Sequence, residues 1–306
     1  MSELEIIKQL SSQLAPLATS MVGPIAGAIF TAIFLRNNTQ TQEFEKLKAG
    51  KLQEVADDLL KSGKMTYTEY YKANNFLKVT QLADKEFNKE KSDFQDNISY
   101  DFDWFIRFYE SVGNISNSTL QNFWAKLLAD EIKHPTSYSF QTLDILKNLN
   151  HKDAILFTKI NSHCITISHN IFLPNYITYL DAASITYNDI MHLDELGLIN
   201  SNSLLALNVP LTPEKKVICN NNSLLITIDS LKLSEIQITQ YPLTSSGSQL
   251  SKMLSTMPSN EDIISFAKEL MEDTNINISI HKVNYIKDGY INYKLQDITE
   301  NYFHKF

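Results

Sequence analysis

The chain has 306 residues and a formal net charge of −8 at pH 7. This length predicts two or more compact units, because domains usually span about 100–200 residues. The acidic balance argues against a protein that wraps a nucleic acid backbone, since affinity for phosphate comes mainly from clustered Lys and Arg. Only two cysteines are present, Cys164 and Cys219, which excludes a disulfide framework and a four-thiolate zinc site and is typical of a reducing, intracellular environment.

An uncharged apolar segment, Leu14 to Leu35, lies near the N-terminus. Its length is close to what a helix needs to cross a hydrocarbon core of about 30 Å at about 1.5 Å per residue. We therefore predict that residues 1–36 form a membrane-competent segment. Arg36 and Lys46 follow it, so the positive-inside rule predicts a segment in the bacterial inner membrane with the rest of the chain on the cytoplasmic side.

Small residues recur every four positions in this segment, at Thr19, Gly23, Gly27 and Thr31. Such a small-residue ridge lets helix backbones approach closely in lipid, and it predicts self-association. Pro24 removes a backbone donor and predicts a kink. The alternative interpretation is that the same helix lies buried in a soluble core or at an oligomer interface. For the membrane interpretation the sequence leaves two locations open: constant insertion in the inner membrane, or a cytoplasmic resting oligomer that shelters the helix until activation.

Residues 37–98 follow as a charged helical hairpin or stalk. Gly63 suits a left-handed position after a helix, and Thr66 with Glu69 has the spacing of a capping box. The sequence therefore predicts that one helix ends near Gly63 and that the next begins near Thr66.

Residues 99–162 are predicted to form a helical core, and apolar residues recur there at spacings of three and four. Trp104, Trp124, Leu127 and Leu128 are its signature, and we interpret both tryptophans as packing residues rather than as ligand platforms. Helices are expected over about 100–113, 118–132, 139–149 and 151–162.

The block from Thr119 to Phe157 resembles a bacterial family catalogued as domain of unknown function 2806, and it is similar in style to the abortive-infection alpha family. This resemblance implies a role in bacterial antiviral defence, with the N-terminal membrane segment as the effector part. It implies no catalytic residues. The positions that carry it are Trp124, Ala125, Leu127, Leu128, Ala129, Ile145, Leu146, Lys147, Leu149 and Ala154.

Residues 163–306 are predicted to form a winged-helix-like α+β domain, so the fold class as a whole is mainly α with a smaller α+β part. Winged helices often bind DNA, but the helix before Gly197 carries Asp189, Asp194 and Glu195 where a reader of the groove would carry Arg, Lys or Asn. No nucleic acid partner is therefore expected. Strands are expected at 204–207 and 224–228, then a Thr-capped helix after 241–244, a helix at 260–272, and a β-hairpin that turns at Asp288 and Gly289.

Chemistry-bearing motifs are few: the sequence has no P-loop, G-x-G-x-x-G, H-E-x-x-H or G-x-S-x-G. The nearest candidate is HCITISH, where His163, Cys164 and His169 could supply zinc ligands or a thiolate and its base. On a strand the two histidines share one face and Cys164 points to the other, which favours ordinary polar roles. Asp130 and Glu131 are expected to lie at a solvated helix end.

We thus expect a protein that is not an enzyme and that holds no cofactor and no metal. The leading hypothesis is a membrane-associated, self-assembling effector or sensor of abortive infection, which oligomerises and disrupts the inner membrane after a phage or partner-protein trigger. The alternative is a soluble oligomeric scaffold or regulator whose N-terminal helix is buried at an interface. A DNA-binding regulator is the weakest of the three hypotheses.

Overall fold

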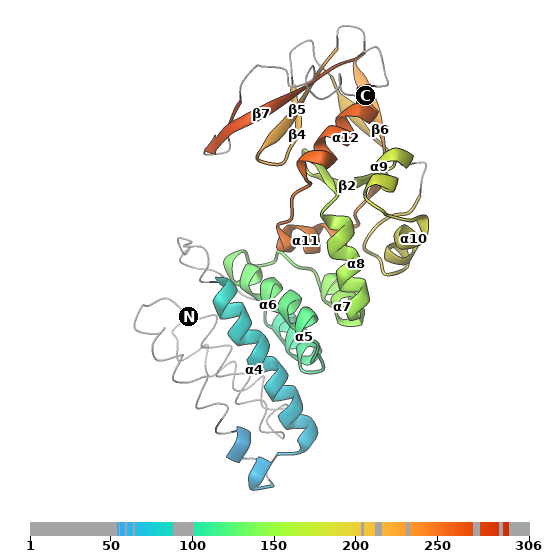
Figure 1. Ribbon diagram of the computed structural model, residues 1–306. Helices are drawn as coiled ribbons and strands as arrows, with labels where there is room; N and C mark the ends of the chain where they lie inside the picture. Colours follow the sequence, from blue (N-terminus) through green and yellow to red (C-terminus); the bar gives the residue numbers. More distant parts are fainter. Residues whose placement is uncertain are drawn as a thin grey trace. The chain divides into compact units, whose positions relative to one another are not determined.

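A computed structural model of the chain describes residues 54, 56–58, 60–63, 65–87, 101–202, 205–211, 216–230, 233–271, 276–287 and 290–293 (Figure 1). The predicted membrane-competent segment, Leu14 to Leu35, and half of the predicted stalk lie outside these residues. Within the described ranges, no helix is both long and apolar enough to cross a membrane. The chain divides into two compact units, residues 1–151 and 152–306, which we call the helical unit and the mixed unit.

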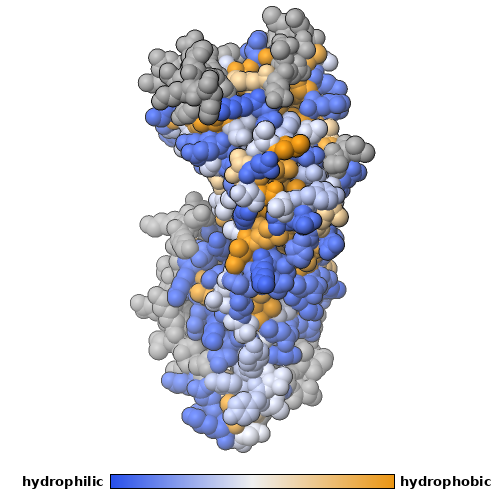
Figure 2. All heavy atoms as spheres, turned by 45° about the vertical axis from the view of Figure 1, so that its right-hand side comes forward, coloured by the Kyte–Doolittle hydropathy of each residue, from blue (hydrophilic) through white to orange (hydrophobic). Residues whose placement is uncertain are grey.

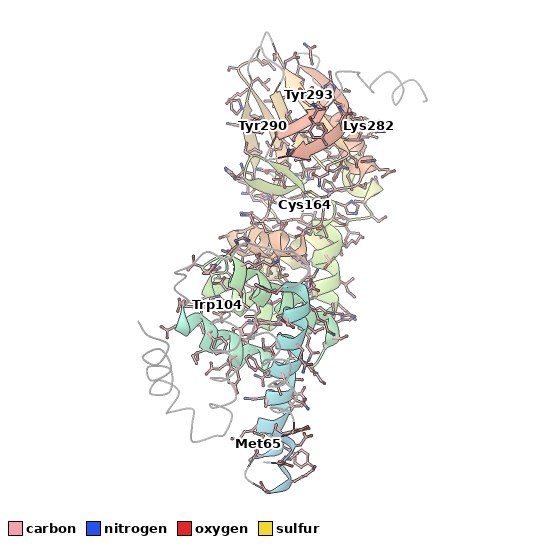
Figure 3. The ribbon with its side chains drawn as sticks, turned by 90° about the vertical axis from the view of Figure 1, so that its left-hand side faces the viewer. Met65, Trp104, Cys164, Lys282, Tyr290 and Tyr293 are labelled. Atoms are coloured by element: carbon pink, nitrogen blue, oxygen red, sulfur yellow. The ribbon has the colours of Figure 1, made fainter. Side chains whose placement is uncertain are left out.

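The described part of the helical unit consists mainly of α4 (Tyr67–Phe87), α5 (Phe102–Val112), α6 (Ser118–Lys133) and α7 (Phe140–Asn148). Helices α4 and α6 pack against each other, and α5 contacts both α4 and α7. Aromatic rings fill the space between them: Trp104 stacks on Phe108 with ring centroids 5.5 Å apart, and Phe108 meets Trp124 edge-on at 5.5 Å. Figure 3 shows Trp104 within this helical bundle.

Short polar side chains set the ends of these helices, as the sequence predicts. The backbone N–H of Thr66 donates to Glu69 at 2.9 Å and the N–H of Glu69 donates to the Thr66 hydroxyl at 3.3 Å, so the capping box before α4 is confirmed. Gly63 has a φ of 70°, in the left-handed region. Asn117 and Ser139 are the N-cap residues of α6 and α7, and their side chains accept backbone N–H groups of the first turn.

The mixed unit carries α8 (His151–Asn161), β1 (Ile165–Ile167), β2 (Asn170–Pro174), α9 (Ile177–Ala182), α10 (Tyr187–Glu195), β3 (Ala206–Pro210), β4 (Lys216–Asn220), β5 (Leu224–Asp229), β6 (Glu235–Pro242), α11 (Ser245–Leu254), α12 (Asn260–Met271), β7 (Asn277–Lys287) and β8 (Tyr290–Tyr293). The sequence-based boundary after residue 162 falls at the end of α8, whereas the division into units falls at its beginning.

Two antiparallel four-stranded sheets organise the mixed unit, with strand orders β1-β2-β6-β3 and β4-β5-β7-β8. Three of the six strand pairs described are hairpins of consecutive strands, and the other three join more distant parts of the chain. For example, Phe172 of β2 lies opposite Pro242 of β6, and Ile226 of β5 lies opposite Ile280 of β7. The second sheet also buries a polar pair, because the Thr227 hydroxyl and the His281 Nε2 lie 2.8 Å apart. Helix α12 packs on β5 and β7.

The start of α11 is pressed against the segment that follows α10. The Thr244 backbone N–H donates to the carbonyl of Leu198 at 3.1 Å, and its hydroxyl donates to the carbonyl of Gly197 at 2.7 Å. A Cβ atom on Gly247 would lie 2.0 Å from the carbonyl oxygen of Leu198, so the close approach requires glycine. This contact ties the start of α11 to the segment that follows α10.

Taken together, the described residues are about half helical with two small antiparallel sheets, so the fold is mixed α+β. The expectation of a mainly α chain underestimated the strands, because β1, β2 and β4 are short and carry polar residues in their sequences. The expected helices of the helical unit, strand β5, helix α12 and the β7–β8 hairpin are present. The predicted turn residues Asp288 and Gly289 lie outside the described residues.

Candidate functional site

The predicted small-residue ridge lies outside the part of the chain that the structure describes. This applies to Thr19, Gly23, Gly27 and Thr31, and also to the predicted kink at Pro24. The ridge therefore stays a prediction.

The core signature, by contrast, lies in one place. Trp104, Trp124, Leu127 and Leu128 are all buried in the helical unit. The Trp104 indole N–H donates to the carbonyl of Tyr138 at 2.9 Å, which fixes the loop between α6 and α7. Packing with their neighbours thus accounts for the positions of these four side chains.

The same loop covers Glu131 of α6, which sequence reasoning placed at a solvated helix end. Glu131 is instead 4% exposed, and its carboxylate accepts the backbone N–H groups of Thr136 and Tyr138 at 2.6 Å and 3.1 Å. Burial raises the pKa of Glu131 to about 7, although these hydrogen bonds pull it the other way. The interpretation was wrong because the segment from Thr136 to Tyr138 folds back over the end of α6. No local sequence pattern predicts this contact.

The three residues of HCITISH that could carry chemistry do not form one site. Cys164 is buried, and its thiol donates to the carbonyl of Ile160 at 3.4 Å, whereas His169 is exposed in the turn between β1 and β2. His163 is turned toward α12, with its Nδ1 2.8 Å from Asp262 Oδ1. Within the described ranges, no three His, Cys, Asp or Glu side chains are grouped so that they could hold a metal ion.

The pair of His163 and Asp262 ties the end of α8 to the start of α12. Asp262 also accepts the backbone N–H of Ser259 at 2.8 Å, and the Tyr179 hydroxyl donates to the carbonyl of His163 at 2.7 Å. Burial alone would raise the pKa of Asp262, but the hydrogen bonds from His163 and Ser259 outweigh it and the pKa is lowered. The pair therefore holds two helices together.

A second histidine–carboxylate pair joins α8 to α10. Nε2 of His192 lies 2.8 Å from Oδ1 of Asp153, which is buried. The histidine is about half exposed. Neither pair was expected from the sequence, because each joins residues far apart in the chain.

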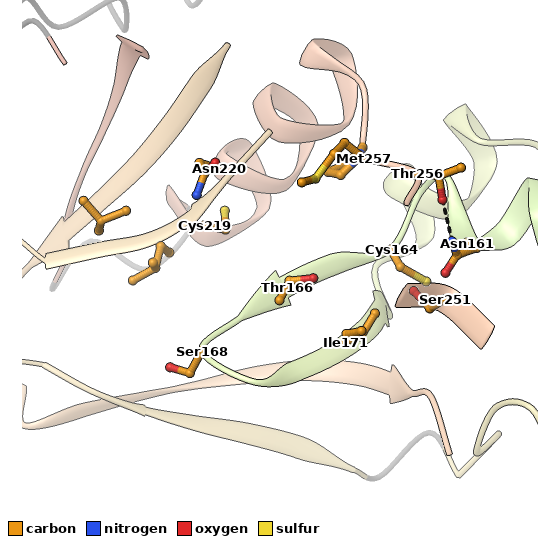
Figure 4. A pocket seen from close by; sticks show the side chains of 13 residues that line it. Asn161, Cys164, Thr166, Ser168, Ile171, Cys219, Asn220, Ser251, Thr256 and Met257 are labelled. Atoms are coloured by element: carbon orange, nitrogen blue, oxygen red, sulfur yellow. Dashed lines mark hydrogen bonds between the residues drawn. The ribbon is translucent and has the colours of Figure 1, made fainter. Parts of the chain in front are cut away.

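A cavity of about 350 Å³ lined by described residues of the mixed unit is a candidate site (Figure 4). Thirteen side chains line it, and every one of them is uncharged. They come from the end of α8, the β1–β2 hairpin, strand β4, helix α11 and the segment between α11 and α12. Both sheets and two helices thus contribute to one hollow.

Both cysteines of the chain lie on the cavity wall, Cys164 beside the end of α8 and Cys219 on β4. Each is free and buried. Burial raises the pKa of Cys164 far above that of an ordinary thiol and raises the pKa of Cys219 to about 12. The thiolate is the nucleophilic form, so these side chains act as small, polarisable wall groups.

The amide of Asn161 is the most unusual group on the wall. Asn161 is 2% exposed, and its Nδ2 group donates to the Thr256 hydroxyl. Its Oδ1 atom has no hydrogen-bond partner among the described residues. Buried polar atoms are nearly always paired, so an unpaired amide oxygen on a cavity wall marks a place where a donor is missing.

Large exposed hydrophobic side chains occur in both units, including Tyr67, Ile177 and Tyr290, which are 81%, 80% and 81% exposed. They belong to different elements, and Figure 2 shows hydrophobic areas set within a largely hydrophilic face. Scattered exposed apolar residues are ordinary on proteins. The cavity, rather than a surface patch, is therefore the feature with the clearest capacity to bind.

Sequence reasoning missed the cavity, although it singled out Cys164 and noted Cys219. Asn161, Thr256 and Cys219 meet only because β4 lies beside the β1–β2 hairpin and α11 ends nearby. No spacing pattern in the sequence predicts that these three residues line the same cavity.

A family model described as "Protein of unknown function (DUF2806)" matches residues 62–266 of the chain. No curated protein and no solved structure matches the chain. The matched region covers most of the helical unit's described part and the mixed unit as far as α12. Because the match spans more than half of the chain, this protein belongs to the DUF2806 family.

Proposed function

We propose that this protein is a membrane-associated, self-assembling effector or sensor of bacterial anti-phage defence, and that it acts by oligomerisation and disruption of the inner membrane. The observation that carries the proposal is the uncharged run from Leu14 to Leu35, whose ridge contains Gly23 and Gly27. This run precedes the region shared with the family, which begins at residue 62. The resemblance to the abortive-infection alpha family supports the choice of defence as the process.

In this proposal the folded region senses or assembles and the N-terminal helices act on lipid. We propose that the mixed unit contains a winged-helix-like module. The succession of α9 and α10 and the antiparallel pairing of β3 with β6 support this assignment. Its helix α10 carries Asp189, Asp194 and Glu195 and no Lys or Arg, which supports a role in protein contacts rather than in reading DNA. Asp189 and Asp194 are also engaged within the fold, by Thr186 and Ser201.

The proposed role is not enzymatic. The two thiols are the strongest nucleophiles in the sequence, and both are buried with raised pKa values. The two histidine–carboxylate pairs join helices to one another. These contacts support structural roles for the residue types on which catalysis would depend.

Fractionation tests the membrane role directly. Full-length protein and a chain that begins at Arg36 are expressed in bacteria and extracted with carbonate and then with detergent. We expect full-length protein in the carbonate-resistant pellet and the shorter chain in the soluble fraction. Full-length protein that dissolves in salt alone contradicts the membrane role.

The ridge is tested by substituting Gly23→Leu together with Gly27→Leu. Bulkier side chains there keep helix backbones apart, so we expect loss of assembly in crosslinking and loss of toxicity and phage resistance in cells. The control is Ala28→Leu with Ala32→Leu, which adds bulk at the same four-residue spacing on another face of the helix. Full activity of the glycine variant removes the ridge from the mechanism.

A second candidate is a soluble oligomeric scaffold or regulator with the N-terminal helix buried at an interface. The interruption of the apolar run by Pro16, Thr19, Ser20 and Pro24 favours it, because these residues lower the gain from insertion into lipid. Salt-soluble oligomers of the full-length protein, converted to monomers by removal of residues 1–35, are the result expected for this role.

A further inference from the structure

We propose that the cavity in the mixed unit binds an uncharged heteroaromatic molecule of about the size of a nucleoside, which reaches the amide of Asn161. The proposal rests on the cavity and its wall and does not depend on the membrane role. Its volume, about 350 Å³, lies at the lower end of the roughly 300–1,000 Å³ typical of ligand sites. A small molecule therefore fits this space better than a peptide side chain or a large cofactor.

The wall determines the charge of the ligand. None of the thirteen lining side chains is charged. A phosphate or carboxylate would lose its water without gaining a cation, and an ammonium group would find no carboxylate. The ligand is therefore uncharged.

The wall also determines the ligand's polarity, because it has two kinds of surface. Ile171, Val217, Ile218, Met257 and Pro258 supply apolar area, and the thioether of Met257 is suited to contact an aromatic ring. Asn220 and Ser251 supply hydrogen-bonding groups, as do Thr166 and Ser168. A flat ring with polar edges matches both surfaces, as in the base of a nucleoside.

The amide of Asn161 gives the site its anchor. One end of the amide bonds the Thr256 hydroxyl, and a hydroxyl can donate or accept. Whichever way the amide is turned, its other end is left without a partner among the described residues. An N–H or C=O at the edge of the ligand's ring would complete the pairing, and the gain is large because an unpaired buried polar atom costs about 1–3 kcal/mol.

The mouth of the cavity is open enough for entry. Met257 is 54% exposed, and the side chain of Thr166 on β1 is also exposed to solvent. Figure 4 shows Cys164 and Asn161 close together at one end of the lining, with Ser168 and Cys219 further away. Thr166 is therefore the position at which a larger side chain narrows the cavity without disturbing the buried wall.

The test is binding to purified full-length protein, measured by ligand-observed NMR and by the shift in Tm. The probes are adenosine, guanosine, cytidine and uridine, and each is compared with its own 5′-monophosphate. We expect at least one nucleoside to bind with a Kd below about 1 mM and its monophosphate to bind at least about ten-fold more weakly. Failure of all four nucleosides to bind overturns the proposal, and so does a monophosphate that binds as well as its nucleoside.

Two variants locate the binding. Thr166→Tyr narrows the mouth and suits a strand, and Asn161→Leu removes the anchor. Each is expected to weaken nucleoside binding at least about ten-fold. Gln237→Tyr is the control, because Gln237 is exposed on β6 and does not line the cavity. Binding that persists unchanged in Thr166→Tyr, in a protein with native circular dichroism, places the nucleoside elsewhere and overturns the proposal.

Discussion

The helical unit is built from neighbours in the chain, whereas the mixed unit also depends on pairing between distant segments. In the helical unit, Trp104, Phe108 and Trp124 come from two successive helices. In the mixed unit, β2 pairs with β6 and β5 pairs with β7, each across a long stretch of intervening chain. The first arrangement gives a dense aromatic core, and the second leaves a cavity lined by both apolar and uncharged polar side chains. We therefore expect a single substitution to lower the stability of the unit that contains it more than the stability of the other unit.

The largest effect is expected from Gly247→Ala in the mixed unit. Its Cβ would lie 2.0 Å from the carbonyl oxygen of Leu198, so the start of α11 must move away. We expect a loss of about 4 kcal/mol or more of unfolding free energy, measured by urea denaturation. Ser248→Ala, one residue later in the same helix, is the control and should change stability by less than about 1 kcal/mol.

Proteolysis of the Gly247→Ala variant sharpens the comparison. We expect rapid cleavage after residue 152 and slow cleavage within α4–α7. Equal cleavage in both regions would mean that the two units unfold as one.

The next largest effect is expected from Phe108→Ala in the helical unit. Phe108 is fully buried and contacts both tryptophans, so truncation leaves a cavity in the aromatic core. We expect a loss of about 3–5 kcal/mol of unfolding free energy, measured by denaturation with tryptophan fluorescence as the signal. Tyr67→Ala is the control, since Tyr67 is 81% exposed and its loss should be nearly neutral. A stability equal to that of the unsubstituted protein would contradict the packing described for this core.

A smaller, pH-dependent effect is expected from Glu131→Gln. Burial raises the pKa of Glu131 to about 7 from an ordinary 4.5. Protonation of this carboxyl therefore stabilises the folded state relative to the unfolded state. That contribution is complete below about pH 4.5 and is lost as the pH rises through about 7. Thermal unfolding should show a decline on the order of 1–3 kcal/mol across this range that Glu131→Gln removes. Glu110→Gln, on the exposed side of α5, should leave the decline in place.

The smallest effect is expected from Asp262→Asn, and its pH dependence runs the opposite way. The pKa of Asp262 is lowered by His163 and Ser259, so the ionised form stabilises the mixed unit above about pH 4, and this contribution is lost as the pH falls through the lowered pKa. The variant should lose about 1 kcal/mol at neutral pH and show a weaker decline in acid. Asp181→Asn, exposed on α9, is the control. An unchanged acid profile would mean that the pair with His163 contributes nothing.

The same contrast explains how much of the fold was predictable. Helix ends in the helical unit follow from local chemistry, such as Thr66 with Glu69 and the cap at Ser139, so the predictions there are close. Strand β5 was found because its residues are almost continuously apolar. Strand β4 was missed, since it has only five residues and its sequence, KVICN, begins and ends with polar residues. Strand β1 lies within HCITISH, whose two histidines the sequence placed on one face of a strand.

Little of the candidate site was predictable, for a related reason. The cavity needs Asn161 from α8, Cys219 from β4 and Thr256 from the segment after α11. These residues are unremarkable in the sequence, and their chemistry appears only when tertiary contacts remove them from water. Glu131 is a similar case in the helical unit, where burial changed the expected role of a carboxylate.

The burial of both native cysteines has a practical consequence for experiments on this protein. Cys164 and Cys219 are the only two thiols in the chain, and their raised pKa values leave almost none of the reactive form near neutral pH. A cysteine introduced at an exposed position, such as Tyr67 in the helical unit or Tyr290 in the mixed unit, should react far faster with a maleimide dye. Fluorescent or spin labels can thus be attached at a chosen position of the otherwise native sequence, and the environment of that position can be followed in solution.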